Sequence, residues 1–259
     1  MKSMELTVIP IKSERKSKKF DLFEEICKSL KNTRISLQNY DVLVISSKFI
    51  SQSQGRIINS DLTTTSDDAK QIAKEFQITP NFSEIIVRES DKIFGGVSGF
   101  TITTSDNILA PNAGIDKSNS YGTKLILYPN QPYLIAEQIK RKIFLKYSIH
   151  VGIIVVDSRL MPGRVGTIGI AIACAGIEPV SDLRGKKDLD GNSLKVTFQA
   201  LADNLASIAN HSMGEANESQ PIAIVRNANA KFTDRKIGHM EMTVPEEQCL
   251  YIRGFKIKK

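Results

Sequence analysis

Three acidic residues on three separate segments could together bind a divalent metal ion. Asp116 lies in a polar turn, Asp157 directly follows the apolar run 152–156, and Glu215 follows a predicted helix. Carboxylate oxygens, completed by a hydroxyl such as that of Ser158, are the ligands that Mg²⁺ and Mn²⁺ prefer. The alternative is that Asp157 caps a turn and that Asp116 belongs to an ordinary Asx turn. The pattern predicts a metal site only if the fold brings the three acids to one cleft.

The position of Glu215 adds an electrostatic argument. Apolar spacing predicts a long helix from Phe198 to Met213 that ends at Gly214. The C-terminus of a helix carries a partial negative charge, so a carboxylate there is disfavoured unless a cation compensates for it. This favours a metal-binding role for Glu215, although an exposed glutamate costs little where salt screens its charge.

Two basic segments could hold anions. Segment 159–169 combines several glycines with Arg159 and Arg164, and backbone N–H groups and guanidinium forks both bind phosphate. It is neither a Walker A loop nor a dinucleotide fingerprint. Lys186 and Lys187 lie beside a turn, where adjacent lysines usually form a solvated face; the functional alternative is a clamp on phosphate or carboxylate groups.

Nucleophilic hydrolase chemistry is disfavoured. His150, His211 and His239 have no partnered nucleophile motif, and the sequence contains no Gly-x-Ser-x-Gly elbow. Cys174 lies in a run of small apolar residues that predicts a place in the core. An enzyme with this sequence would work through positioned ions and phosphates.

Composition narrows the partners. The 259 residues include 35 Lys and Arg against 28 Asp and Glu, for a formal net charge of +7. This excess suits anionic small substrates, an acidic surface or nucleic acid. The absence of Trp and of any nucleic-acid-reading motif argues against nucleic acid. Three cysteines cannot form a disulfide scaffold and no apolar run could span a membrane, so we expect a cytoplasmic protein that binds neither nucleic acid nor membrane.

The elements that would position these residues alternate between short apolar strands and amphipathic helices. This predicts an α+β (mixed α/β) fold, a single compact unit with lobes in which mixed sheets are flanked by helices. Predicted strands are Leu6–Ile11, Asp41–Ser46, Phe100–Thr104, Lys124–Tyr128, Gly152–Val156 and Ile222–Val225. Predicted helices begin near Phe20, Ser66, Pro80, Pro132 and Phe198. We expect residues 1–230 to form one domain, with residues 231–259 as a C-terminal extension packed on it.

Taken together, the motifs resemble one known family. In chain order they are 41–48 (Asp-Val-Leu-Val-Ile-Ser-Ser-Lys), 54–56 (Gln-Gly-Arg), 112–119 (Asn-Ala-Gly-Ile-Asp-Lys-Ser-Asn), 157–158 (Asp-Ser), 185–191 (Gly-Lys-Lys-Asp-Leu-Asp-Gly) and 213–215 (Met-Gly-Glu). This order resembles the coenzyme F420 γ-glutamyl ligase family from about Val8 to Arg226, and segment 112–119 is its most specific part.

The resemblance implies a function. Members of that family use GTP and a divalent metal, Mg²⁺ or Mn²⁺, to join L-glutamate to a carboxylate of the deazaflavin cofactor precursor through an acyl phosphate. The implied partners are L-glutamate and an acidic pterin or deazaflavin acceptor, and the implied assembly is a homodimer with an unusual mixed α/β fold.

The resemblance also implies residue roles. Asp116, Asp157 and Glu215 match catalytic metal ligands, and Ser158 supplies the hydroxyl where the family has threonine. The residues implied to bind the nucleotide are Ser47, Lys48, Gln52, Asn119, Arg164, Lys187, Met213 and Gly214.

Several positions depart from the family pattern. Gln52 replaces a lysine, Leu160-Met161 replaces a Gly-Arg pair for which Arg159 could substitute, Asp190 replaces an aromatic residue and Asn204 replaces an acid. These changes leave the three acids intact and alter their surroundings, as expected if the acceptor differs while the reaction is retained. Two alternatives follow: a folate-polyglutamylating ligase of the same family, or a paralogue that binds a nucleotide without turnover.

Overall fold

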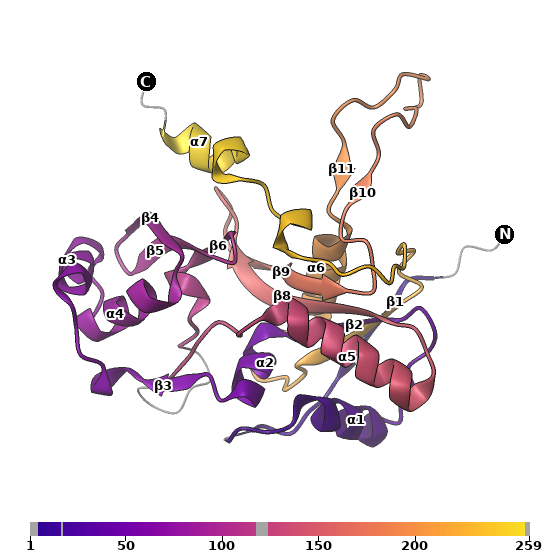
Figure 1. The fold of residues 1–259 in the computed structure, drawn as a ribbon, viewed down its shortest axis with the longest axis horizontal. Coiled ribbons are helices and arrows are strands. Elements are labelled where there is room, and N and C mark those ends of the chain that lie inside the picture. The colour runs from indigo at the N-terminus through magenta and orange to yellow at the C-terminus, as the bar shows by residue number, and fades with distance from the viewer. Residues whose placement is uncertain (1–4, 17, 118–123, 257–259) are drawn as a thin grey trace.

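A five-stranded mixed sheet forms the centre of the molecule (Figure 1). In this computed structural model, which describes residues 5–16, 18–117 and 124–256, the strand order is β1-β12-β2-β8-β9. Strands β2 and β8 are parallel and the other neighbours are antiparallel. The strands span Thr7–Ile11 (β1), Val42–Ser46 (β2), Gly152–Leu160 (β8), Thr167–Ala175 (β9) and Ile222–Arg226 (β12).

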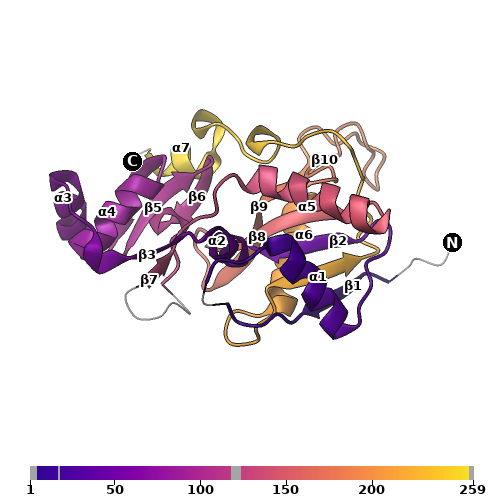
Figure 2. The same ribbon diagram turned by 60° about the horizontal axis from the view of Figure 1, so that its bottom comes forward.

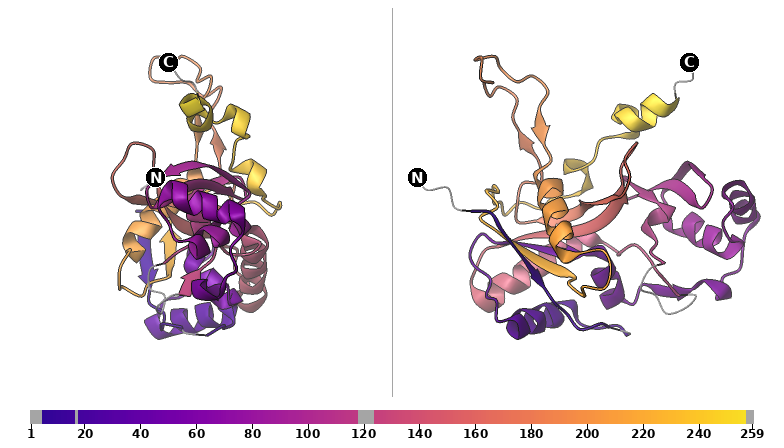
Figure 3. Two further views of the ribbon diagram at one scale, coloured as in Figure 1. Left: turned by 90° about the vertical axis from the view of Figure 1, so that its left-hand side faces the viewer. Right: turned by 180° about the vertical axis from the view of Figure 1, so that it is seen from behind.

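Helices cover both faces of this sheet. Helices α1, α2 and α5 pack on one face and helix α6 packs on the other (Figures 1 and 3). They span Leu22–Thr33 (α1), Ser47–Gln54 (α2), Pro132–Tyr147 (α5) and Leu201–Met213 (α6). The sequence of β2 is continuously apolar because both of its faces are buried. Leu43 and Ile45 face α1 and α5, while Val42 and Val44 face α6.

A second lobe is built around a three-stranded antiparallel sheet, β4-β5-β6, with helices α3 and α4 beside it (Figure 2). Its core contains Phe82, Ile85, Ile86 and Leu125. The short strands β3 and β7 pair where the chain enters and leaves this lobe, and β7 contributes Leu125 to its core. The bounds are Ile57–Asn59 (β3), Asp67–Phe76 (α3), Pro80–Glu89 (α4), Lys92–Val97 (β4), Phe100–Ser105 (β5), Ile108–Pro111 (β6) and Lys124–Ile126 (β7).

Two segments extend from the central sheet. Strands β10 (Ser181–Asp182) and β11 (Phe198–Gln199) form the base of an arm that projects away from the body (Figure 1). The C-terminal segment packs Ile237 and Met242 against the core under α6, and it ends in α7 (Leu250–Lys256). Short 3₁₀ helices complete the fold at Ser60–Leu62, Asn112–Gly114, His239–Glu241 and Glu246–Gln248.

The α+β class predicted from the sequence is confirmed, and several element bounds need correction. Strand β8 runs on from Val156 to Leu160 because its polar residues pair with β9 in an antiparallel ladder. Phe198 belongs to β11 rather than to the long helix, which begins at Leu201. Strand β7 is shorter than predicted and ends at Ile126. Within the described parts of the chain, no helix is both long and apolar enough to cross a membrane.

Candidate active site between the two lobes

A cavity of about 820 Å³ contains all three acidic residues singled out in the sequence. Asp116 enters it from the turn after β6, Asp157 from strand β8 and Glu215 from the segment after α6. Segment 13–16, the first turn of α2 and segment 216–221 complete the wall. Residues separated by almost a hundred positions therefore share one cleft, as the sequence argument required.

Asp157 owes its position to a difference in length between two parallel strands. Strand β2 ends at Ser46, which pairs with Val156, whereas β8 continues. The Asp157 side chain therefore lies beside the start of α2, where the Ser47 hydroxyl donates a hydrogen bond of 2.5 Å to its Oδ1 atom. The partial positive charge of the helix N-terminus further stabilises a carboxylate there.

Arg159 lies on the same face of β8 and forms an ion pair with the other oxygen of Asp157. Its side chain is only 5% exposed. The guanidinium packs against the turn at Gly114, where an added Cβ atom would lie 3.0 Å from the Nη2 atom of Arg159. Gly114 also has a positive φ of 68°, so glycine is required there for both space and backbone conformation.

Asp116 forms an ion pair with Lys48 of α2. Both side chains are about 30% exposed, at 29% for Lys48 and 31% for Asp116, so solvent weakens the attraction. The backbone N–H of Asp116 donates to the carbonyl of Ile126 at 2.9 Å, which ties this turn to β7. The pair links α2 of the main sheet to the second lobe across the cavity.

Glu215 is held by hydrogen-bond donors from three elements. Ser158 of β8 donates at 2.7 Å and Asn210 of α6 at 2.6 Å, and Thr167 of β9 makes a longer contact at 3.4 Å. The sequence argument called for a cation to offset the helix C-terminus at Gly214. In the structure, neutral hydrogen-bond donors stabilise the negative charge of Glu215 instead. One of them, Asn210, lies in the last turn of α6, just before the carboxylate.

The donor set fits a hard divalent cation, since it consists of carboxylates and a hydroxyl that face a cavity. The three carboxylates do not, however, converge on one point. Among the residues that the structure describes, no three His, Cys, Asp or Glu side chains come together as a group that could hold an ion. Asp116 and Asp157 are each engaged by a protein cation, and Glu215 by neutral donors.

The other sequence-predicted residues divide into two sets. Gln52, Met213 and Gly214 line the cavity beside Lys48, and Ser47 contacts Asp157. Arg164 lies in the exposed turn between β8 and β9, and Lys187 lies in the projecting arm; neither lines the cavity. Asn119 lies outside the described residues.

Sequence reasoning missed Asn210, Thr167 and the contribution of Arg15 and Lys16. The run of basic residues between the first strand and α1 was a signal that could have pointed to segment 13–16, which lines the cavity. Asn210 and Thr167 had no comparable signal, because their role depends on the close packing of α6 against β9.

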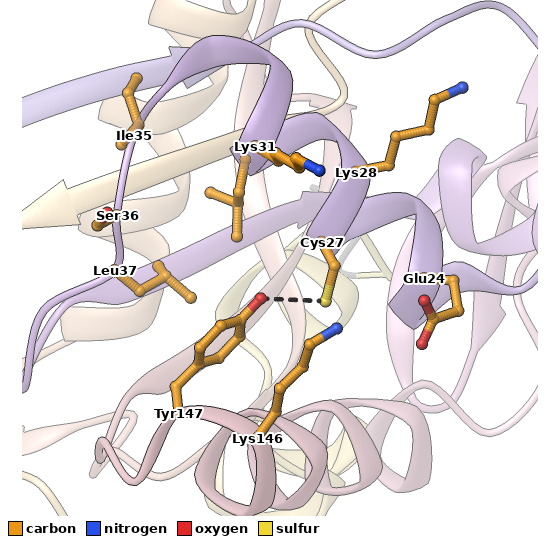
Figure 4. Close-up of a pocket in the computed structure, with 10 residues that line it drawn as sticks. Glu24, Cys27, Lys28, Lys31, Ile35, Ser36, Leu37, Lys146 and Tyr147 are labelled. Atoms are coloured by element: carbon orange, nitrogen blue, oxygen red, sulfur yellow. Dashed lines mark hydrogen bonds between the residues drawn. The ribbon is translucent and has the colours of Figure 1, made fainter.

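A second cavity, of about 550 Å³, lies between α1 and α5 (Figure 4). Within it the Tyr147 hydroxyl contacts Cys27 at 3.4 Å, and burial raises the pKa of Tyr147 to about 12. None of the predicted site residues that the structure describes lines this cavity. Cys174, by contrast, is fully buried in the core, as predicted, and burial raises its pKa to about 12.

Comparison with known proteins defines the class. Residues 10–227 match the family model described as F420-0:gamma-glutamyl ligase, and the chain belongs to this family. It is therefore a ligase of the class that forms amide bonds.

Individual relatives are similar to this chain over most of their length. The chain is 36% identical to the coenzyme F420:L-glutamate ligase of Methanocaldococcus jannaschii over 217 residues, covering 83% of this chain and 86% of the relative. It is 34% identical to the protein of the same name from Methanopyrus kandleri, with 85% and 86% covered. For the Archaeoglobus fulgidus protein, also so named, the identity is 32%, with 87% and 89% covered.

Proposed function

We propose that this chain joins L-glutamate to a carboxylate of coenzyme F420-0, or of a related pterin acceptor, at the expense of GTP. The observation that carries the proposal is the shared cavity of Asp116, Asp157 and Glu215. The names of the relatives support the acceptor and the amino acid. All the substrates are anionic, and the cavity also contains Lys48 and Arg159.

The chemistry requires activation of a poor electrophile. An oxygen of the acceptor carboxylate attacks the γ-phosphorus of GTP, GDP leaves, and an acyl phosphate forms. The amine nitrogen of glutamate then attacks the acyl carbon, phosphate leaves, and the amine loses a proton as the amide forms. No protein nucleophile is needed, which agrees with the lack of a Ser-His or Cys-His motif.

The protein residues position and neutralise the substrates. Asp116, Asp157, Glu215 and the Ser158 hydroxyl would hold Mg²⁺ or Mn²⁺, which neutralises charge on phosphoryl oxygens when bound. Lys48 and the N-terminus of α2 favour negative charge at the same edge of the cavity. The acyl phosphate must be kept from water, and we infer that the walls contributed by both lobes serve this purpose.

The acceptor and the assembly are further parts of the proposal. Gln52 lines the cavity where the family pattern has lysine, which removes a cation and supports an altered acceptor such as a folate. The projecting arm carries exposed Leu189, Val196 and Phe198, and such apolar side chains suit contact with a second copy in a homodimer. Light scattering of the purified chain tests this; a monomer would contradict it.

Incubation with GTP, Mn²⁺, L-glutamate and one acceptor at a time tests the function. We expect coenzyme F420-0 or a folate to gain the mass of a glutamyl residue while GDP accumulates. GTP binding without GDP formation for every acceptor would instead support a non-catalytic paralogue. The preferred acceptor follows from the ratio of kcat/KM values.

A further inference from the structure

Arg159 is an unusual buried charge. Among the buried side-chain atoms that the structure describes, only a few lack a hydrogen-bond partner, and the Nε and Nη2 atoms of Arg159 are the charged ones. Leaving donors of a buried cation unpaired is unfavourable, so such atoms call for an explanation. One explanation is that these atoms bind an anion that is not part of the protein.

The geometry of the unpaired atoms defines what they would bind. Nη1 of Arg159 is occupied by Asp157. The remaining Nε and Nη2 atoms form one edge of the planar guanidinium, with two parallel N–H donors that match the two oxygens of a carboxylate or phosphate. Lysine has no equivalent of this edge.

Arg226 of β12 shows how the same edge is filled elsewhere in this protein. Its Nε donates to Oδ1 of Asp41 at 2.9 Å and its Nη2 donates to Oδ2 at 2.8 Å. A third bond runs from Nη2 to the carbonyl of Ser36 at 3.0 Å. Arg226 thus has the bidentate carboxylate that Arg159 lacks.

Arg159 lies in the wall of the active-site cavity, and its Nε–Nη2 edge is buried there. Arg159 and Gly114 both line the cavity, and Gly114 presents no side chain to the guanidinium. Asp157 neutralises part of the charge and orients the side chain through Nη1. The position therefore combines a held cation with an unpaired, buried fork at the wall of a site whose proposed substrates are all anions.

We propose that the Nε–Nη2 edge of Arg159 binds an oxyanion of a substrate, either a phosphate of the nucleotide or a carboxylate of glutamate or the acceptor. This inference rests on the proposed function for the identity of the substrates. Arg159 would then compensate for the cations lost at Gln52 and Met161, positions at which the family pattern has lysine and arginine.

Isothermal titration calorimetry with Arg159→Gln tests the proposal. The probes are GTP with Mg²⁺, inorganic phosphate, L-glutamate and coenzyme F420-0, each titrated separately. We expect one chemical class to bind about 10- to 100-fold more weakly, since a hydrogen-bonded ion pair is lost. Weaker binding of GTP and phosphate identifies a phosphate site, whereas weaker binding of glutamate or F420-0 identifies a carboxylate site.

Arg159→Lys separates the fork from the charge. It retains the cation, so the fold is preserved if the charge is what Asp157 needs, but we expect it to recover only part of the lost affinity. Arg226→Gln is the matched control, because it breaks an Arg–Asp pair on the same sheet whose fork is already filled. It should leave every affinity within about twofold, while a lower melting temperature reports its structural role.

Affinities within about twofold of wild type for all four probes, in an Arg159→Gln or Arg159→Lys protein with a cooperative melting transition, would overturn the proposal. Product formation by the wild type is measured separately. A wild type that makes no glutamyl product, together with weaker phosphate binding by Arg159→Gln, would overturn the function and retain the oxyanion site.

Discussion

The Ser47 hydroxyl donates a hydrogen bond of 2.5 Å to Asp157, and this contact joins residues 110 positions apart in the chain. It forms where β2 ends and β8 continues, so Ser47, the first residue of α2, lies beside the Asp157 side chain of the neighbouring strand. The difference in length between two parallel strands thereby orients the Asp157 carboxylate in the cavity.

Ser47→Ala should reduce activity more than stability. Losing one hydrogen bond of this kind lowers the free energy of unfolding by about 1 kcal/mol, and we expect kcat to fall because Asp157 is no longer held on that side. Steady-state kinetics and urea unfolding measure the two effects. Ser53→Ala in the same helix is the control, since its hydroxyl donates to the local carbonyl of Ile50 at 2.7 Å. Equal kcat values for the two variants would contradict this role.

Glu215→Gln should weaken metal binding without unfolding the protein. The amide places an NH₂ group where the carboxylate now accepts bonds from Ser158 and Asn210, and it removes a negative charge. We expect about 10- to 100-fold weaker Mn²⁺ binding by electron paramagnetic resonance. Asp67→Asn, at an exposed position on α3, serves as the control. Unchanged Mn²⁺ affinity in Glu215→Gln would exclude Glu215 from the proposed metal site.

Gly169→Ala should damage both packing and the site. A Cβ atom there would lie 2.4 Å from the Cβ of Asn210 and 2.8 Å from the carbonyl oxygen of Ala206. Helix α6 must then move, at a cost of about 1–3 kcal/mol in unfolding free energy, and Asn210 shifts from Glu215. Chemical unfolding and activity are both measured. Gly254→Ala has open space and should change neither; a stable, fully active Gly169→Ala would refute the close packing.

The second lobe should lose stability in acid through Glu84. Hydrogen bonds from the hydroxyl and backbone of Ser66, followed by one from Arg88, lower the pKa of Glu84 from 4.5 to about 2. The stabilisation is therefore fully present above pH 4.5 and is lost as the pH falls toward 2. Unfolding of wild type and Glu84→Gln across this range should give curves that differ at pH 7 and converge near pH 2. A constant difference would contradict the assignment.

Helix starts and strands could be predicted from the sequence wherever the residue types at those positions determine them. Ser66 caps α3 and Pro80 begins α4, as their residue types predicted. The strand at Gly152–Val156 was predicted from its β-branched run, but its extension was not, because Asp157 and Ser158 are polar and remain in the strand only through pairing with β9.

The candidate site was predictable in part for the same reason. Carboxylates can be recognised by type, and the three acids do share a cavity. Thr167 and Asn210 could not be recognised, because they acquire their contacts from tertiary packing, and Arg159 was predicted as an anion-binding residue but not as the partner of Asp157. The burial of Arg159 in particular depends on the close approach of the Gly114 turn, which nothing in its local sequence indicates.

The most direct test compares wild type and Asp157→Asn in the complete reaction with coenzyme F420-0, GTP, Mn²⁺ and L-glutamate. Mass spectrometry should show a glutamyl adduct and an equal amount of GDP for the wild type, and a rate about 100- to 1,000-fold lower for the variant. Coenzyme F420-0 that gains no glutamate with the wild type, or an Asp157→Asn protein as fast as the wild type, would contradict this account of the site.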